Sequence, residues 1–427
     1  MKTKAVRLYG VNDLRLEEFD LPEINDDEIL AHVVSDSICM SSYKASIQGP
    51  NHKRVPNDVA ENPVIIGHEF CGEIVKVGAK WQDQFKAGDK FSIQPAINYK
   101  GSLASPGYSY KYIGGDATYV IIPHEVMELG CLLPYKGEAF FYGSLSEPMS
   151  CIVGGYHANY HTKAGVYKHE MGIVEGGSMA VLAGAGPMGL GLIDYAIHCD
   201  RKPGVLVVTD IDSSRLARAS EVLSPAEAEK NGVKLYYVNT NDYADENDPE
   251  AADKYLRSLT KDGAGFNDVF VYAPVKGVVE QGDRLLARDG CLNFFAGPTN
   301  TQFSAMFNFY NVHYASTHIV GTSGGNTSDM IESIEYMQSG KINPAAMITH
   351  IGGLNAVVET TLNLPKIPGG KKLIYTNKDM PLTAIADFAE KGKDDPFYAD
   401  LAEIVSRNNG LWCAEAEKYV LANAKNI

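Results

Sequence analysis

Four side chains in the sequence have the chemistry of metal ligands. Cys39 lies in SDSICMSSYK, the adjacent pair His68 and Glu69 lies in IIGHEFCGEIVKVG, and Glu147 precedes a proline in SLSEPMSCIVGGYH. A catalytic zinc site needs three protein ligands and an open position, and thiolate, imidazole and carboxylate groups all suit zinc. Taken singly, a lone cysteine or a His-Glu pair is more typical of a structural residue. These residues therefore predict a zinc site only if the fold brings them together.

A second group of residues has the pattern of a dinucleotide-binding turn. The segment VLAGAGPMGLG contains Gly184, Gly186 and Gly189, and it lies between an apolar strand and an apolar helix, which is the context that this pattern needs. The first glycine permits a tight turn, the second lets the backbone approach a pyrophosphate, and the third allows close helix–strand packing. Pro187 and Met188 would begin the helix, whose free N–H groups would face the phosphates.

The next apolar strand, GVLVVTDID, ends at Asp210. A carboxylate at this point can accept hydrogen bonds from both ribose hydroxyls and would repel a 2′-phosphate, so it favours NAD(H) over NADP(H). Two alternatives stay open. Asp210 could instead cap the helix that begins near Ser213, and Arg215 could face the adenine or a 2′-phosphate, which would suit NADP(H).

The order of elements predicts how these residues are positioned. Residues 1–160 show short strands separated by turns, typical of a mostly β, partly open barrel. Within them, residues 94–115 are rich in Gly, Ser, Pro and Tyr and predict a long surface loop. Strands and helices alternate in residues 161–341, which predicts a doubly wound parallel sheet. Residues 342–378 return to the first domain, and 379–427 form a helical extension, for which we predict packing and no chemistry.

Composition excludes several classes of protein. The chain has 427 residues, a net charge of −15 and an ordinary 45% hydrophobic content, which argue for a soluble two-domain protein and against nucleic acid or an anionic membrane as partner. Its seven cysteines are scattered and never form a CxxC pair, so a reducing cytoplasm is expected. Neither an apolar leader nor a membrane-spanning run is evident.

Taken together, these segments resemble the zinc-dependent medium-chain dehydrogenase/reductase family over residues 1–378. The segments that carry the resemblance are Cys39, GHEFCGEIVKVG, FKAGDKF, GGDATYV, EPMSC, GAGPMG and VVTDID. The Glu147-Pro148 pair and Asp210 are similar to the sorbitol dehydrogenase branch. At finer scale, YSYKYIGGDATY and GSLSEPMSCIVG resemble the L-sorbose 1-phosphate reductase group. The resemblance implies an α/β protein with a GroES-like partly open β-barrel catalytic domain and a Rossmann domain.

The resemblance also implies site residues and a reaction. Cys39 and His68 would bind one catalytic zinc ion, Glu69 and Glu147 would complete the ligand sphere directly or through water, and Ser41 would pass the substrate proton. The reaction would be hydride transfer between NAD(H) and a sugar, with zinc polarising the substrate oxygen. The implied interconversion is L-sorbose 1-phosphate to D-glucitol 6-phosphate. An unphosphorylated polyol dehydrogenase and a catalytically silent nucleotide-binding relative are the alternatives.

Two departures from the family pattern bear on these expectations. Residues 94–115 contain no cysteine, so we expect no second, structural zinc. Lys44 stands where many relatives keep a proton-relaying histidine. Because an acidic protein needs local cations to bind a phosphorylated sugar, Lys44, Lys53 and Arg54 are candidates for phosphate recognition, with a solvated loop as the alternative. A homo-oligomer, either a dimer or a tetramer, is expected by analogy with other Rossmann sheets.

Overall fold

The computed structural model describes all residues, 1–427, and the chain divides into two compact units. The first comprises residues 1–148, 326–340 and 344–427, and the second comprises residues 149–325 and 341–343. The boundary after residue 148 falls within one long helix, α3 (Phe140–Ala158). No helix combines the length and the apolar character that crossing a bilayer requires.

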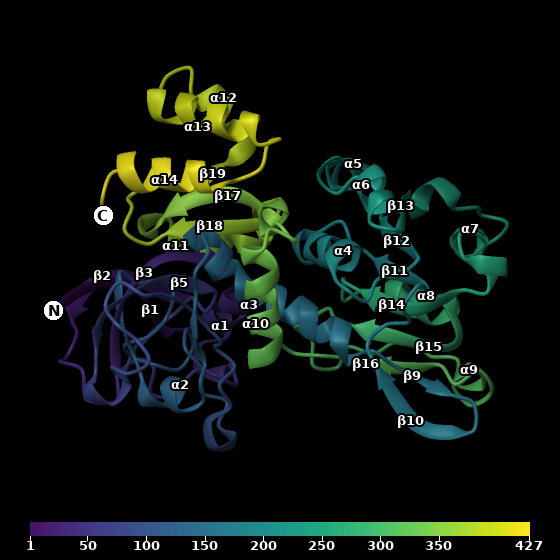
Figure 1. Cartoon of the computed structure of the whole chain (residues 1–427), viewed down its shortest axis with the longest axis horizontal. Helices are drawn as coiled ribbons and strands as arrows, with labels where there is room; N and C mark the ends of the chain where they lie inside the picture. The colour runs from purple at the N-terminus through teal and green to yellow at the C-terminus, as the bar shows by residue number, and fades with distance from the viewer. The chain divides into compact units, whose positions relative to one another are not determined.

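The first unit is built on two sheets (Figure 1). A three-stranded sheet has the order β2-β1-β4, and an eight-stranded sheet has the order β19-β17-β18-β3-β5-β6-β8, with β7 paired to β3. The strands are β1 (Lys2–Gly10), β2 (Asp13–Asp20), β3 (Ile29–Ile38), β4 (Val64–Ile65), β5 (Phe70–Val77), β6 (Lys90–Ile93), β7 (Tyr119–Ile122), β8 (Leu132–Pro134), β17 (Ile348–Gly353), β18 (Lys371–Tyr375) and β19 (Thr383–Ala384). The helices are α1 (Met40–Gln48), α2 (His124–Glu128), the first part of α3, α10 (Thr327–Gln338), α11 (Val357–Asn363), α12 (Phe388–Lys391), α13 (Pro396–Arg407) and α14 (Ala414–Asn423).

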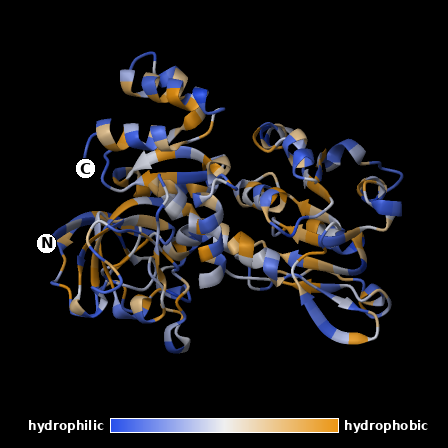
Figure 2. Ribbon diagram, in the orientation of Figure 1, coloured by the Kyte–Doolittle hydropathy of each residue, from blue (hydrophilic) through white to orange (hydrophobic).

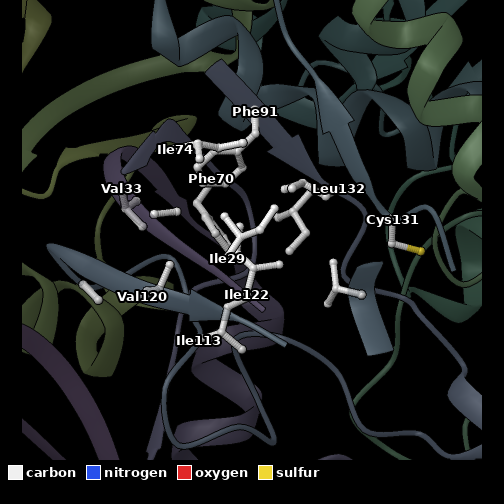
Figure 3. Close-up of a cluster of buried hydrophobic side chains, with 14 of the residues drawn as sticks. Ile29, Val33, Phe70, Ile74, Phe91, Ile113, Val120, Ile122, Cys131 and Leu132 are labelled. Carbon is white, nitrogen blue, oxygen red and sulfur yellow. The ribbon is translucent and has the colours of Figure 1, made fainter. Parts of the chain in front are cut away.

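The core of the strand-rich half follows from strand periodicity. Alternate residues of a strand point to one face, and Ile29 and Val33 of β3 accordingly lie in one buried cluster with Phe70 and Ile74 of β5 and with Phe91 of β6 (Figure 3). Phe70 and Phe91 meet edge to face, with ring centroids 6.2 Å apart. This packing fixes β3 and β5, the two strands whose ends carry the candidate metal ligands.

The second unit contains a six-stranded parallel sheet of order β13-β12-β11-β14-β15-β16. Its strands are β11 (Ser178–Leu182), β12 (Val205–Asp210), β13 (Lys234–Asn239), β14 (Phe266–Val271), β15 (Leu286–Phe294) and β16 (His318–Val320), and a hairpin of β9 (Tyr160–Lys163) and β10 (Val166–Met171) precedes them. The helices are α4 (Pro187–His198), α5 (Ser213–Val222), α6 (Pro225–Lys230), α7 (Ala251–Ser258), α8 (Lys276–Leu285) and α9 (Phe309–Tyr314). The strand order, which reverses beside β11, is that of a Rossmann sheet, so the predicted α/β fold is confirmed.

Two expectations about local structure are wrong. Residues 94–115 contain only a short 3-10 turn at Tyr99–Gly101, as expected of a loop, but Ile97, Tyr108 and Ile113 are buried, so the segment enters the interior. The apolar and aromatic side chains of this segment explain its burial, because removing them from water offsets the cost of ordering the loop. In the extension, residues 383–384 form the short strand β19 rather than the start of a helix.

Candidate metal and cofactor sites

Cys39 lies between strand β3 and helix α1, in the N-cap position of the helix. Its backbone is extended, with φ −107° and ψ 149°, and its Sγ accepts a hydrogen bond from the N–H of Ser41 at 3.5 Å. Burial raises the pKa of the Cys39 thiol, and the nearby Glu69 carboxylate raises it further. The thiol is therefore neutral by itself, and a bound cation is needed to stabilise the thiolate.

His68 and Glu69 follow a tight turn at Gly67 that only glycine fits. Gly67 has φ +88°, and a Cβ at this position would lie 2.6 Å from the backbone N of Asp116 and 2.8 Å from Oδ2 of Asp36. The N–H of Glu69 donates to Oδ1 of Asp36 at 3.1 Å. This turn directs both ligand-type side chains inward, and both are buried.

The fold brings three of the candidate ligands together. One ligand atom each of Cys39, His68 and Glu69 lies within 4.8 Å of the others, and all three residues belong to the first unit. Burial lowers the pKa of His68, so the imidazole is neutral, which is the form that binds metals. A thiol, an imidazole and a carboxylate at this spacing fit zinc, whose ligand distances are about 2.0–2.3 Å.

Glu147 interacts electrostatically with Cys39, His68 and Glu69. It lies in α3, and burial raises its pKa to about 7, with the carboxylate of Glu69 and the thiol of Cys39 acting in the same direction while His68 opposes them. Glu147 is not one of the three residues whose ligand atoms lie within 4.8 Å of one another. It is therefore placed beside the cluster rather than in it.

Glu69 is also held by a buried lysine. Nζ of Lys371, the first residue of β18, contacts both carboxylate oxygens, at 2.6 Å from Oε2, and the hydroxyl of Ser37 donates to Oε2. Burial alone would raise the pKa of Glu69, but Lys371 outweighs it and holds the pKa below its usual value. Burial likewise opposes the charge of Lys371, yet Glu69 raises the pKa of this ammonium group. Both side chains are consequently ionised.

Tyr108, in the loop of residues 94–115, completes the surroundings of His68. Its hydroxyl lies 3.2 Å from Nε2 of His68, whose Nδ1 lies 3.3 Å from the hydroxyl of Ser42. Ser41 lies close by, because it lowers the pKa of both Tyr108 and Cys39 against the effect of burial. The hydroxyl groups of Tyr108 and Ser42 thus lie at the two ring nitrogens of His68.

A cationic segment, made of Lys44, Lys53 and Arg54 around His52, lies near Tyr108. The ring of His52 stacks on that of Tyr108, with centroids 5.8 Å apart, and Cζ of Arg54 lies 5.7 Å from the Tyr108 centroid. Burial lowers the pKa of His52 to about 4, and the positive charges of Lys53, Arg54 and Lys44 lower it too. All three cations therefore lie near His52, and Lys53 is exposed whereas Arg54 and Lys44 are half-buried.

The glycine-rich turn of the second unit has room for a ligand at one position only. A Cβ on Gly189 would lie 2.0 Å from the carbonyl oxygen of Gly184, which requires glycine for packing, whereas a Cβ on Gly186 would meet nothing within 4 Å. Gly186 is the N-cap of α4, which begins with Pro187 and Met188 and has no side-chain cap. Its first N–H groups therefore lack a capping side chain, and the cradle fits a pyrophosphate.

Asp210 faces this turn and does not cap the following helix. Its Oδ2 accepts from the N–H of Ala185 at 3.2 Å, and its Oδ1 accepts from the N–H groups of Ile211 and Asp212. The N-cap of α5 is Asp212, whose side chain accepts from the N–H of Arg215 and lies 3.5 Å from the Arg215 guanidinium. The helix-cap alternative for Asp210 is therefore wrong.

Two residues of the metal region, Tyr108 and Lys371, are not predicted from the sequence, because neither belongs to a recognisable motif. Tyr108 lies in a tyrosine-rich loop in which no spacing distinguishes it from its neighbours, and Lys371 lies in GGKKLIYT. The position of Lys371 at the start of an otherwise apolar strand could have indicated its role. A lysine in such a strand is expected to be buried, and a buried lysine needs a buried partner.

Comparison with known proteins agrees with this geometry. Residues 25–130 match the alcohol dehydrogenase GroES-like domain. The chain is 50% identical to L-sorbose 1-phosphate reductase of Klebsiella pneumoniae, over 100% of this chain and 98% of the relative. The chain belongs to the zinc-dependent medium-chain dehydrogenase/reductase family. It is an enzyme of the dehydrogenase class, which works with zinc and a nicotinamide cofactor.

One further relative and one solved structure carry the names of other dehydrogenases. The dehydrogenase is 54% identical to mannitol-1-phosphate 5-dehydrogenase of Aliivibrio fischeri, over 98% of this chain and 97% of the relative. The crystal structure of 2R,3R-butanediol dehydrogenase from Bacillus subtilis shares the fold, with a TM-score of 0.68, 20% sequence identity and coverage of 88% of this chain and 100% of the other. Relatives of high identity thus carry the names of two different sugar-phosphate activities.

Proposed function

We propose that this dehydrogenase interconverts a ketose phosphate and a polyol phosphate, with L-sorbose 1-phosphate and D-glucitol 6-phosphate as the pair. The observation that carries the proposal is the convergence of Cys39, His68 and Glu69 within 4.8 Å, with the Arg54 guanidinium 5.7 Å from the ring of Tyr108, which contacts His68. In a ketose 1-phosphate the phosphorus is separated from the carbonyl carbon by only two atoms. A substrate whose oxygen lies at the cysteine–histidine pair would therefore place its phosphate near this cationic segment.

In this reaction, each residue of the site would have a separate role. Cys39 and His68 would bind the zinc ion, with Glu69 and Glu147 completing its surroundings. A bound zinc ion supplies Lewis acidity toward the substrate oxygen, and the nicotinamide supplies or accepts the hydride. Ser41, two residues after Cys39, would exchange the substrate proton.

We further propose that NAD(H) is the cofactor in use. The carboxylate of Asp210 lies beside the glycine turn, where a 2′-phosphate would be repelled. The ion pair between Arg215 and Asp212 supports this, because it partly neutralises the cation that would favour NADP(H). The expected preference for NADH over NADPH in kcat/KM is at least about tenfold, and initial rates with each cofactor measure it. A preference for NADPH would contradict the assignment of Asp210.

The proposed function is tested by NADH oxidation with pairs of phosphorylated and unphosphorylated sugars. L-sorbose 1-phosphate is compared with L-sorbose, and fructose 6-phosphate with fructose, before and after zinc is removed with a chelator and restored. We expect the highest kcat/KM with L-sorbose 1-phosphate and loss of activity without zinc. Activity confined to free sugars would favour a polyol dehydrogenase, and no activity with any sugar would favour a silent nucleotide-binding relative.

Arg54 provides a sharper test of phosphate recognition. Charged hydrogen bonds contribute about 1.5–3 kcal/mol, so Arg54→Gln is expected to lower kcat/KM for the phosphorylated ketose by about 10- to 100-fold. The same variant should change kcat/KM for the free sugar less than about threefold. Lys44→Ala should act in the same direction.

Lys53→Ala is the matched control for this prediction, because it removes the same charge from the adjacent, exposed position. Steady-state kinetics with both sugars separate the outcomes. Equal losses on the phosphorylated and free sugar would refute a phosphate role for Arg54. An effect of Lys53→Ala as large as that of Arg54→Gln would assign the recognition to general surface charge instead.

We also propose that the enzyme is a homo-oligomer formed through strand β16. This three-residue strand is the edge of the parallel sheet, and the exposed aromatic residues Phe309, Tyr310 and Tyr314 precede it in the chain. An unpaired edge can pair with a second copy of itself. Sedimentation equilibrium measures the assembly, and a monomer at micromolar concentration would contradict this proposal.

A further inference from the structure

The C-terminal extension packs on the elements that carry the metal region. Helices α12, α13 and α14, drawn in yellow in Figure 1, lie in the same unit as strands β17 and β18. Figure 2 shows that hydrophobic and hydrophilic residues alternate along them, as in helices with one buried face. Trp412, Leu401 and Val420 from the extension share one buried cluster with Phe141 and Leu145 of α3.

One polar residue lies within this apolar contact. Glu417 of α14 is 2% exposed, and its carboxylate accepts hydrogen bonds from the backbone N–H of Phe140 at 2.6 Å and of Phe141 at 2.9 Å. These are the first two residues of α3, whose N–H groups have no acceptor within the helix. Glu417 therefore caps a helix that lies more than 270 residues earlier in the chain, as the separations of 277 and 276 residues show.

The same carboxylate is bonded to a second element. The hydroxyl of Tyr375, the last residue of β18, donates to Oε2 of Glu417 at 3.0 Å, and Nε1 of Trp412 donates to that hydroxyl at 2.8 Å. Strand β18 begins with Lys371, the partner of Glu69. Glu417 is thus bonded to two of the elements that bring ionisable side chains to the metal region: α3 with Glu147 and β18 with Lys371.

The chemistry of the three donors suits a carboxylate and not its amide. Every contact of Glu417 is one in which it accepts a hydrogen bond, and a glutamine would turn an NH₂ group toward at least one backbone N–H. Burial raises the pKa of Glu417 to about 7, against the opposing effect of the two N–H donors. Burying a carboxyl group is costly unless it is hydrogen-bonded, and the three donors offset this cost.

We infer that Glu417 is a positioning residue for the metal site. By capping α3 it fixes the rise and rotation of the helix, and Glu147 lies two turns along this helix from Phe140. By holding Tyr375 it fixes the register of β18 at Lys371. The C-terminal extension would therefore help to hold α3 and β18 in the positions that the metal site requires. This inference rests on the proposed role of Glu147 beside the metal.

The test compares Glu417→Gln with Lys418→Ala. Lys418 is the neighbouring residue of α14 and forms an exposed ion pair with Glu138 at 2.6 Å, so it contacts the same region of the chain without capping α3. Substitution of groups that orient metal ligands costs about 10- to 100-fold in metal affinity or activity. We expect Glu417→Gln to weaken zinc affinity or kcat by about tenfold, and Lys418→Ala to leave both within about twofold of the parent.

Three readouts separate positioning from plain stabilisation: the zinc dissociation constant, kcat well below the melting temperature, and hydrogen exchange of peptides spanning residues 138–150. The expected result is faster exchange in this segment together with weaker zinc binding or lower kcat. A lower melting temperature with unchanged zinc affinity and unchanged kcat would overturn the inference, as would no change in any readout.

A second variant covers the case in which Glu417→Gln does not fold. Tyr375→Phe removes one donor and leaves both backbone contacts of Glu417, so the same changes should appear at reduced size. No change in zinc affinity or kcat in this variant would then overturn the inference. If the parent enzyme binds zinc but acts on none of the sugars, the proposed function fails, while zinc affinity and exchange still decide the role of Glu417.

Discussion

Cys39→Ala is expected to lower kcat/KM by at least about a thousandfold, because the Lewis acidity of a bound metal contributes several kcal/mol to catalysis. Cys39 is the only sulfur ligand of the three-residue cluster, and the two ligands that remain, one imidazole and one carboxylate, are too few to hold zinc tightly. The purified variant should also contain much less zinc than the parent. Elemental analysis after gel filtration measures the metal, and NADH oxidation measures the activity.

Cys413→Ala is the control for this variant. Cys413 is half-buried like Cys39 and belongs to no metal-ligand cluster. It should keep its zinc and its activity. Retention of full zinc content by Cys39→Ala would remove this residue from the ligand set, and retention of activity without zinc would contradict the proposed chemistry altogether.

Lys371→Met is expected to cause the largest loss of stability. Removing one partner of a buried ion pair leaves an uncompensated charge and costs about 3–5 kcal/mol. Here the orphaned group would be Glu69, which is 1% exposed. Denaturant unfolding of the zinc-free protein measures the free energy of unfolding.

A double-variant cycle checks the cause of that loss. Lys371→Met combined with Glu69→Gln removes both charges, so the double variant should recover much of the stability that the single variant loses. Additive losses in the cycle would mean that the two side chains are not coupled. In the parent, the pair's contribution is present above the ordinary glutamate pKa. It is lost as the pH falls through the lowered pKa of folded Glu69.

The sequence predicts the parts of the site that depend on local geometry. The roles of Gly184, Gly186 and Gly189 follow from one strand–turn–helix, so their spacing, together with the apolar strand before it and the apolar helix after it, predicts the observed turn. His68 and Glu69 similarly follow a glycine that forces the turn. The fold class could be predicted for the same reason, since the alternation of strands and helices is a local pattern.

The other residues of the site depend on contacts that no local pattern carries. Lys371 meets Glu69 across a separation of 302 residues, and it does so because β18 pairs with β3 in one register. Adjacent residues of a strand point to opposite faces. Lys372, the next residue, accordingly donates to the carbonyl oxygens of Pro368 and Gly370 instead. Nothing in the pair of lysines distinguishes the one that binds Glu69.

The bonds of Glu417 have a consequence for how the protein is made. On the ribosome, segments fold in the order in which they emerge, and the strands that carry Cys39, His68 and Glu69 emerge first. Glu69 gains its cation only when residue 371 has been synthesised, and α3 gains its cap only after residue 417. The sheet of residues 178–320 can form earlier, since its strands pair only with one another. We therefore expect the nucleotide-binding sheet of the nascent chain to fold first. The metal-binding unit is completed only after residues 371 and 417 near the C-terminus have been synthesised.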